Sequence, residues 1–222
     1  MIRHAIIMAA GRGMRMMPLT ASIPKPMAYF KDSTLIADAI SRIHSRIENI
    51  HITVGYKGAD LARHVIEQGV SSIFNTEGKG NAWWLFNTLM KHLDQPLIVL
   101  TCDNVVDLDL DLIYKDYESF NSPCCMVVPV KPVEGLDGDF IFHKDNCVTE
   151  LNRHKPSEIY CSGIQVLNPA RINNMCKPAD DFYSVWMQLI EKKQLFSSNI
   201  YPKKWYAVDT LEQLDMINKL SS

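Results

Sequence analysis

Short apolar runs alternate with amphipathic helical patterns along this chain, and that alternation is the feature that most restricts its fold. The apolar runs are rich in β-branched residues and are bounded by polar residues, glycine or proline, as buried strands are. They cover residues 5–9, 50–55, 71–74, 97–101 and 125–129. Helical patterns cover residues 35–47, with Ser33 as the predicted N-cap, and residues 59–68, 82–92 and 110–120. The alternation predicts an α/β fold with a mixed, mostly parallel sheet and helices on both faces.

The pattern changes after about residue 130. Shorter strand patterns at residues 140–143, 148–151 and 163–167 precede helical patterns at residues 181–192 and 211–220. We therefore expect one domain over residues 1–222, with a small α+β insertion in its second half.

Composition excludes several classes of protein. The 222 residues carry a net charge of −2 and no blocks of lysine and arginine, so a nucleic-acid binder is not expected, because counterion release needs clustered positive charge. No run approaches the ~20 apolar residues that span a bilayer, and the first residues lack the pattern of a signal peptide. The six cysteines form no Cys-x-x-Cys pair and are expected to be reduced. We expect a cytoplasmic protein without membrane insertion.

The loop that follows the first predicted strand carries the strongest functional signal. It leaves the carboxyl end of that strand, which is where open α/β sheets bind ligands. Gly11 and Gly13 allow the backbone to approach a ligand closely, and Arg12, Arg15 and Lys25 bring positive charge to the same short segment. The loop therefore predicts a binding site for a polyphosphate.

Two better-known phosphate motifs do not match this loop. Met16 occupies the place of the third glycine in G-x-G-x-x-G, which disfavours a Rossmann oxidoreductase, and no Gly-Lys-Ser/Thr ending marks a P-loop. A glycine-rich turn with solvated arginines is the remaining structural alternative.

The complete string Ala-Ala-Gly-Arg-Gly-Met-Arg-Met-Met-Pro-Leu-Thr, followed by Pro-Lys-Pro-Met, resembles the signature of the sugar-phosphate nucleotidyltransferase family. The resemblance implies a Rossmann-like nucleotide-diphospho-sugar transferase domain. It also implies that the loop wraps a nucleoside triphosphate, with Arg15 and Lys25 as catalytic groups on the reacting phosphates. The nucleotide-binding residues that it implies are Ala9, Ala10, Gly11, Arg12, Gly13, Asn75 and Gly80.

Two aspartates resemble the family's metal ligands. Asp103 closely follows the buried run at residues 97–101, and Asp209 lies in a segment similar to the family's closing Trp, Asp and Thr motif. The resemblance implies that both carboxylates hold Mg²⁺, a cation that prefers oxygen ligands. The alternatives are that Asp103 caps a helix or forms a turn, and that Asp209 is an N-cap.

The predicted acceptor side departs from the family pattern. Residues 80–84 read Gly-Asn-Ala-Trp-Trp, which is closer to phosphocholine cytidylyltransferases than to enzymes that use hexoses. The acceptor-binding residues that the resemblance implies are Asn81, Trp83, Glu150, Lys155, Ser162 and Gly163. As alternatives, the tryptophans at 83 and 84 pack against the sheet, and Glu150 and Lys155 form only a surface ion pair.

The function implied by this resemblance is the Mg²⁺-dependent transfer of a nucleoside monophosphate from a nucleoside triphosphate to a sugar 1-phosphate. Pyrophosphate and a nucleotide sugar are the products. Residues 1–130 would form the nucleotide-binding half, and residues 131–222 would bind the acceptor and complete the metal site. A cytidylyltransferase for a phosphorylated amine or polyol is the alternative enzyme, and a regulatory paralogue that binds nucleotide sugars is the non-enzymatic alternative. The base, the acceptor and self-association into a homo-oligomer stay open.

Overall fold

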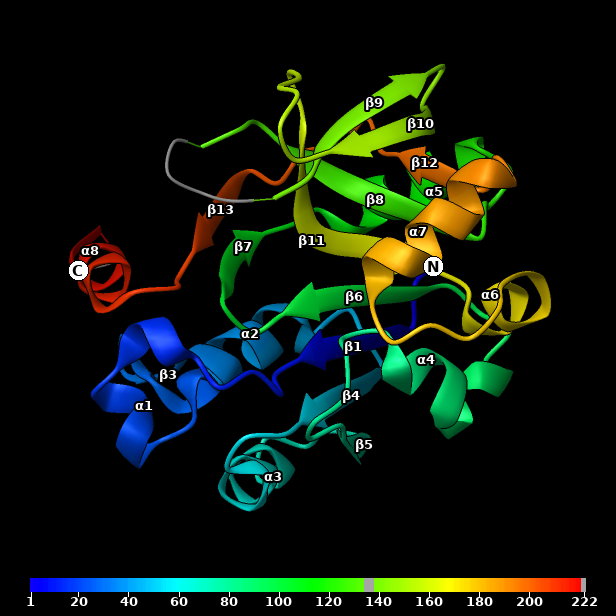
Figure 1. Ribbon diagram of the computed structural model, residues 1–222. Coiled ribbons are helices and arrows are strands. Elements are labelled where there is room, and N and C mark those ends of the chain that lie inside the picture. The colour runs from blue at the N-terminus through cyan, green and yellow to red at the C-terminus, as the bar shows by residue number, and fades with distance from the viewer. Residues whose placement is uncertain (134–137, 221–222) are drawn as a thin grey trace. The chain divides into compact units, whose positions relative to one another are not determined.

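The computed structural model describes residues 1–133 and 138–220, and Figure 1 shows its elements. The chain divides into two units, each of which is built from separated segments. Unit 1 consists of Met1–Ile2, Gly80–Val99 and Leu108–Lys203, and unit 2 consists of Arg3–Lys79, Leu100–Asp107 and Lys204–Ser222. These units do not divide the chain at residue 130, because the closing segment belongs to unit 2 together with the N-terminal loop. The assignment of a nucleotide half and an acceptor half stays a prediction.

Unit 2 contains three parallel strands in the order β5-β4-β1. They are β1 (His4–Met8), β4 (Asn49–Val54) and β5 (Ser72–Asn75), connected by α2 (Leu35–His44) and α3 (Gly58–Ile66). The predicted N-cap at Ser33 is wrong, because Ser33 pairs with Phe30 in a short hairpin. Thr34 caps α2 instead, and its side chain accepts a hydrogen bond from the Ala37 N–H.

Short elements complete unit 2, and the sequence did not predict most of them. They are 3-10 helix η1 (Met14–Met16), α1 (Leu19–Ser22), 3-10 helix η2 (Lys25–Met27), the hairpin β2 (Tyr29–Phe30) and β3 (Ser33–Thr34), and the antiparallel pair β7 (Asn104–Asp107) and β13 (Lys204–Ala207). Helix α8 (Leu211–Leu220) has the predicted bounds. In Figure 1 this red helix lies beside the blue N-terminal elements, and Asn218 bonds the backbone of Tyr29 and Lys31 there.

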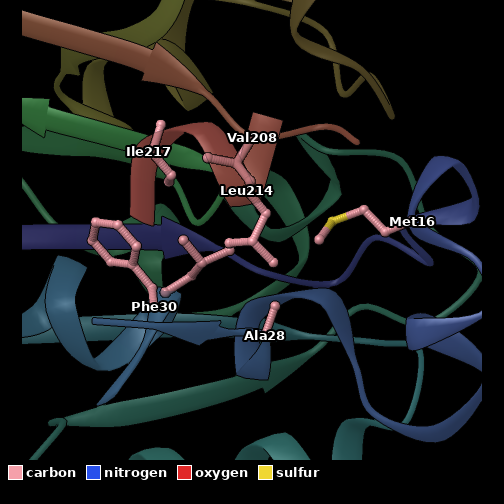
Figure 2. Packing of buried hydrophobic residues seen from close by; sticks show 7 residues of the cluster. Met16, Ala28, Phe30, Val208, Leu214 and Ile217 are labelled. Carbon is pink, nitrogen blue, oxygen red and sulfur yellow. The ribbon is translucent and has the colours of Figure 1, made fainter. Parts of the chain in front are cut away.

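One buried cluster joins the start of the chain to its end. Its members come from the N-terminal loop, the hairpin, the start of α2, and the segment around α8: Met16, Ala28, Phe30, Leu35, Val208, Leu214 and Ile217. Figure 2 shows Leu214 and Val208 directed toward Phe30 and Met16. This packing fixes the segment before α8 against the N-terminal loop.

Unit 1 holds a mixed sheet in the order β6-β11-β8-β12-β10-β9. Its strands are β6 (Leu97–Thr101, which ends in unit 2), β8 (Cys125–Val130), β9 (Phe140–Lys144), β10 (Cys147–Asn152), β11 (Tyr160–Leu167) and β12 (Leu195–Ser197). In this sheet β8 and β12 pair in parallel, while β11 runs antiparallel to both β6 and β8. The helices of unit 1 are α4 (Trp83–Asn87), 3-10 helix η3 (Leu89–His92), α5 (Leu110–Ser119), α6 (Pro169–Met175) and α7 (Phe182–Glu191). With the parallel strands of unit 2, this architecture confirms the α/β class and its mixed sheet.

The predicted helix at residues 82–92 is two helices. Thr88 has extended backbone angles, and its side chain accepts the Met90 N–H at 3.2 Å while its hydroxyl donates to the Trp84 carbonyl at 2.7 Å. Thr88 therefore ends α4 and starts η3. Its side chain competes with the backbone for hydrogen bonds, and the spacing of apolar residues in the sequence does not reveal this competition.

Trp84 lies in the core of unit 1. It is 1% exposed and meets the ring of Phe182 edge to face, with 6.2 Å between the ring centroids. Trp84→Ala should lower the free energy of unfolding by ~3 to 5 kcal/mol, which thermal melting of the purified variant measures. Among the described residues Trp84 Nε1 has no hydrogen-bond partner, so Trp84→Phe loses packing volume but no bond and should melt between the alanine variant and the wild type. Equal melting of the alanine variant and the wild type would contradict this packing.

Two histidines on neighbouring strands of unit 2 make its stability depend on pH. The rings of His4 and His51 stack, with nitrogens 3.2 Å apart, and His51 also contacts Ser72 Oγ at 2.7 Å. Burial, and next the charge of His4, lower the pKa of His51 to about 4, and burial is the main cause that lowers the pKa of His4. The folded protein therefore resists protonation at a pH where the unfolded chain, with its ordinary histidine pKa, accepts a proton.

Stability should accordingly fall as the pH drops from about 6.5 toward 4, and be retained above 6.5. Between pH 7 and 5 the loss attributable to His51 should be ~2 kcal/mol, since one pKa unit corresponds to ~1.4 kcal/mol. Urea unfolding at both pH values measures it. His51→Asn, which keeps polar atoms near Ser72 but does not titrate, should show a smaller loss over the same range. Identical pH dependence in the two proteins would rule out this role for His51.

Candidate active site

The N-terminal loop of unit 2 starts from a fixed backbone. The Ala9 N–H donates to the carbonyl and to the hydroxyl of Thr53, at 3.1 Å each, and the Ala10 carbonyl accepts the Tyr56 N–H at 3.1 Å. Gly11, by contrast, is exposed, and a Cβ added there would meet no atom within 4 Å. The end of β4 thus holds the first residues of the loop, while the backbone at Gly11 faces open space.

Gly13 brings the loop close to Lys25. Its φ of +61° is in the left-handed region, and an added Cβ would lie 2.8 Å from Lys25 Cβ. The Gly13 carbonyl accepts the Thr20 hydroxyl at 3.0 Å and the Met16 N–H at 2.9 Å. Only glycine fits this close approach, so the second glycine of the motif positions a cation as well as a turn.

Arg12 lies over the face of Tyr56, with its guanidinium carbon 5.2 Å from the ring centroid. The Tyr56 hydroxyl in turn donates to the Thr20 carbonyl at 3.0 Å. This cation–π contact holds a positive charge at the edge of the loop.

Lys25 lies between two carboxylates from distant parts of the sequence. Its Nζ is 2.9 Å from Asp103 Oδ2, just after β6, and 2.9 Å from Asp209 Oδ1, just after β13. Lys25 is 7% exposed. Burial alone would lower its pKa, but the opposing effect of the Asp103 and Asp209 carboxylates is larger in sum, so the pKa is raised and the amine stays protonated. Arg15, which is largely exposed, reaches Asp209 Oδ2 at 3.1 Å. The structure thus brings together the four residues that the sequence analysis named as catalytic or metal-binding.

Asp209 does not cap α8. Thr210 does, because its hydroxyl accepts the Gln213 N–H at 3.2 Å while Gln213 Oε1 accepts the Thr210 N–H at 3.1 Å, a capping box. Gln213 Oε1 also accepts the Asp209 N–H at 2.6 Å. The capping alternative for Asp209 is therefore wrong, and its carboxylate is directed to Lys25 and Arg15 instead.

The two carboxylates suit a divalent cation. They share one cation in this structure, the ammonium of Lys25, and Mg²⁺ at nucleotide sites is bound by one or two carboxylates together with phosphate oxygens. In the described part of the chain, no three histidine, cysteine, aspartate or glutamate side chains form a cluster that could hold a metal. A metal held by Asp103 and Asp209 would therefore need further oxygens, from a substrate or from water.

The other two predicted nucleotide residues lie in different units. Asn75 ends β5 in unit 2, where its side chain accepts the Glu77 N–H at 3.0 Å and forms a turn. Gly80 belongs to unit 1, and an added Cβ would lie 2.1 Å from the Asp180 carbonyl oxygen. The same oxygen accepts the Ala82 N–H, so Gly80 permits a close backbone contact before α7.

Unit 1 contains a cavity of about 790 Å³. Its walls come from the loop before β9, the end of β10, β11, and the first turns of α7, which lies beside β10 and β12 in Figure 1. The lining residues include the predicted Asn81 and Gly163, and Asn81 Oδ1 accepts the Phe182 N–H at 2.9 Å. The cavity has the size and the mixed polar and aromatic lining of a small-molecule site.

The remaining predicted acceptor residues lie elsewhere in unit 1. Among the described residues that line the cavity, Trp83, Glu150, Lys155 and Ser162 are not found. Ser162 is buried, and its hydroxyl donates to the Val128 carbonyl at 2.6 Å. Lys155 is exposed and Glu150 is half-buried, and Lys155 Nζ lies 3.8 Å from Glu150 Oε2, which matches the surface ion pair considered as their alternative.

The sequence did not predict any of the charged and aromatic side chains that line the cavity among the described residues. These are Asp139, Arg153, His154, Asp181, Phe182, Tyr183 and Trp186. Two of them, Arg153 and His154, directly precede Lys155 in the motif of the acceptor side. Their place in the sequence does not indicate which of these side chains lines a cavity.

No helix within residues 1–133 and 138–220 combines the length and the apolar character that crossing a bilayer requires.

A strand-end glycine loop thus lies in unit 2 beside a lysine and an arginine that contact a pair of carboxylates. Residues 4–218 match the nucleotidyl transferase family, and the chain belongs to that family. It is 28% identical over 221 residues to a mannose-1-phosphate guanyltransferase of Pichia angusta, covering 91% of this chain and 60% of that protein. It is 25% identical over 182 residues to a UTP–glucose-1-phosphate uridylyltransferase of Haloferax volcanii, covering 75% of this chain and 72% of that protein.

The fold is also that of solved nucleotidyltransferases. The CTP:phosphocholine cytidylyltransferase of Streptococcus pneumoniae superposes with a TM-score of 0.78 at 20% identity, covering 99% of each chain. The chain spans about 60% of the length of the guanyltransferases that it matches.

Proposed function

We propose that this protein transfers a nucleoside monophosphate from a nucleoside triphosphate to a sugar 1-phosphate, which makes a nucleotide sugar and releases pyrophosphate. The observation that carries the proposal is the meeting of Arg15, Lys25, Asp103 and Asp209 beside the glycine loop. Family membership and the sugar-phosphate relatives support it. A role in nucleotide-sugar and polysaccharide biosynthesis, in the cytoplasm where nucleoside triphosphates are made, follows from the same proposal.

The proposed reaction needs no nucleophile from the protein. An oxygen of the acceptor phosphate attacks the α-phosphorus, a bond forms there, and the bond from the α-phosphorus to the bridging oxygen breaks as pyrophosphate leaves. The work of the protein is alignment and charge neutralisation. The loop backbone from Ala9 to Gly13 would hold the triphosphate, and Arg15 would stabilise the charge that develops on the α-phosphate. Lys25 would hold the two carboxylates in place and reduce the repulsion between the two anionic substrates.

Asp103 and Asp209 would hold Mg²⁺, which neutralises phosphate oxygens and favours the departure of pyrophosphate when it is bound. In the structure both carboxylates contact Lys25, and Asp209 also contacts Arg15. These cations keep the pair of negative charges close together before a triphosphate arrives.

One observation favours the alternative acceptor, a phosphorylated amine. The cavity of unit 1 has the carboxylates of Asp139 and Asp181 together with the aromatic rings of Phe182 and Trp186, a combination that also attracts a quaternary ammonium group. The fold shared with the phosphocholine enzyme is consistent with this alternative. A sugar 1-phosphate stays the first proposal, because the curated relatives act on sugar phosphates.

A coupled pyrophosphate assay tests the function. It crosses CTP, UTP, GTP, ATP and dTTP with hexose, heptose and amino-alcohol phosphates, with Mg²⁺ present or removed by a chelator. We expect pyrophosphate release with one nucleotide and one acceptor class, and none after chelation. Binding of nucleotide sugars without turnover for any pair would instead favour a regulatory paralogue.

A further inference from the structure

Tyr56, which lies between β4 and α3 in unit 2, holds the glycine loop at both of its ends. The Tyr56 backbone N–H donates to the Ala10 carbonyl at 3.1 Å, and the Tyr56 hydroxyl donates to the Thr20 carbonyl at 3.0 Å. The Thr20 hydroxyl in turn donates to the Gly13 carbonyl at 3.0 Å. One residue outside the loop is thus bonded to the place where the loop begins and to the place where it ends.

The ring of Tyr56 also brings two positive charges together. The guanidinium carbon of Arg12 lies 5.2 Å from the ring centroid, and the ammonium nitrogen of Lys57 lies 5.8 Å from it. The electron-rich face of an aromatic ring attracts cations. The ring therefore offsets part of the repulsion between the two side chains and keeps both charges beside the loop.

These two cations supply the net positive charge of the loop. Lys25 and Arg15 are also positive, but they contact the two carboxylates of the site, which balance their charge. Among the described residues, by contrast, no carboxylate forms an ion pair with Arg12 or Lys57. A polyanion that approaches the loop is therefore attracted mainly by the charges held at Tyr56.

Arg12 keeps its hydrogen-bond donors available for such a ligand. A cation–π contact uses the face of the ring and needs no N–H group. Within the described chain the exposed Arg12 side chain makes no hydrogen bond. A guanidinium binds phosphate oxygens through parallel N–H bonds. The ring thus orients Arg12 before a ligand arrives and leaves its donors for phosphate.

We infer that Tyr56 is a positioning residue for the nucleoside triphosphate, and that it holds Arg12 and Lys57 where they bind the two outer phosphates, which leave as pyrophosphate. The inference rests on the proposed function, in which Arg15 and Lys25 act at the α-phosphate. The base is uncharged, so the outer phosphates are the part of the nucleotide that two further cations attract.

Calorimetric titration with the mono-, di- and triphosphate of each nucleoside in the pyrophosphate assay tests the inference, and inorganic tripolyphosphate is the probe without a base. Arg12→Gln and Tyr56→Leu should each weaken triphosphate binding ~10-fold, the effect of losing one hydrogen bond to a charged group. Lys57→Gln should also weaken it. Monophosphate binding should stay within about 2-fold of the wild type. Tyr56→Phe, which keeps the ring and loses only the bond to Thr20, should recover most of the affinity.

Arg63→Gln and Tyr29→Leu are the matched controls, because they remove an exposed cation from α3 and an exposed tyrosine from β2. Both should bind every ligand as the wild type does. If Tyr56→Leu weakens the monophosphate as much as the triphosphate, Tyr56 only supports the fold of the loop and the inference is overturned. It is also overturned if Arg12→Gln and Lys57→Gln bind tripolyphosphate like the wild type.

Two further outcomes keep the test decisive. If Tyr56→Leu melts well below the wild type, the Arg12 and Lys57 variants decide, because they change only side-chain charge beside the loop. If the wild type binds a triphosphate but releases no pyrophosphate with any acceptor, the proposed function fails while the same titrations still decide the inference. A wild type that binds neither a triphosphate nor tripolyphosphate would overturn both.

Discussion

Asp103→Asn and Asp209→Asn are each expected to lower turnover at least ~100-fold, while the double variant should lose little more than the worse single variant. Both carboxylates lie 2.9 Å from one Lys25 ammonium, and both would serve one metal site, so removing either disables the same unit. Asparagine keeps the size and shape of the side chain and removes only its charge. Turnover at saturating substrates for the four proteins of the double-mutant cycle measures the coupling.

Asp107→Asn is the matched control, since this carboxylate lies at the other end of β7 from Asp103. It should keep wild-type turnover. If the losses of turnover in the two single variants add up in the double variant, Asp103 and Asp209 act separately. Loss of activity for Asp103→Asn alone would leave Asp209 as no more than a support for Lys25 and Arg15.

Arg15→Ala should reduce turnover ~100-fold, which is the size of effect reported by removing one donor to a charged transition state. The nucleotide KM should change less, because the loop backbone and Arg12 remain. The Arg15 side chain is 68% exposed, so its ion pair with Asp209 contributes only ~0 to 1 kcal/mol and the melting temperature should stay near that of the wild type. Steady-state kinetics and a melting curve on the same preparation separate the two effects.

Arg63→Ala removes an arginine on α3 that is also largely exposed, and serves as the control. An Arg15 variant that folds normally and turns over like the wild type would remove Arg15 from the proposed reaction.

The strands and helices that the sequence predicted best are those whose bounds follow from the pattern of the residues within them. The run at β6 was predicted with its observed bounds because its first four residues are apolar and buried. The α8 helix was predicted for the same kind of reason, since a helical period is local. By contrast, β7 and β13 are four residues each with mixed polarity, and they exist because they pair across about a hundred residues of sequence. No local pattern predicts such a partner.

The candidate site divides in the same way. The glycine loop and its cations could be located from one continuous segment, whereas the meeting of Asp103 and Asp209 at Lys25 was implied only by the family resemblance. On the acceptor side the motif pointed to Lys155, whose Nζ lies 4.4 Å from the centroid of the Phe142 ring, and its role toward an acceptor stays a prediction. Side-chain direction after a turn depends on hydrogen bonds that a spacing rule does not contain. The sequence therefore located the glycine loop and its cations better than the residues that line the cavity.

The pairing of β7 with β13 also bears on how new specificities can arise on this scaffold. Asp107 and Lys204 are opposite one another in that pair, so the long segment between them leaves and rejoins unit 2 at a single place. That segment contributes every described residue of the cavity wall except Asn81. A segment whose two ends lie side by side can be replaced without moving the residues to which it is attached. Grafting the equivalent stretch from a relative with a different acceptor should thus exchange selectivity for the acceptor and leave Lys25 and its two carboxylates where they are.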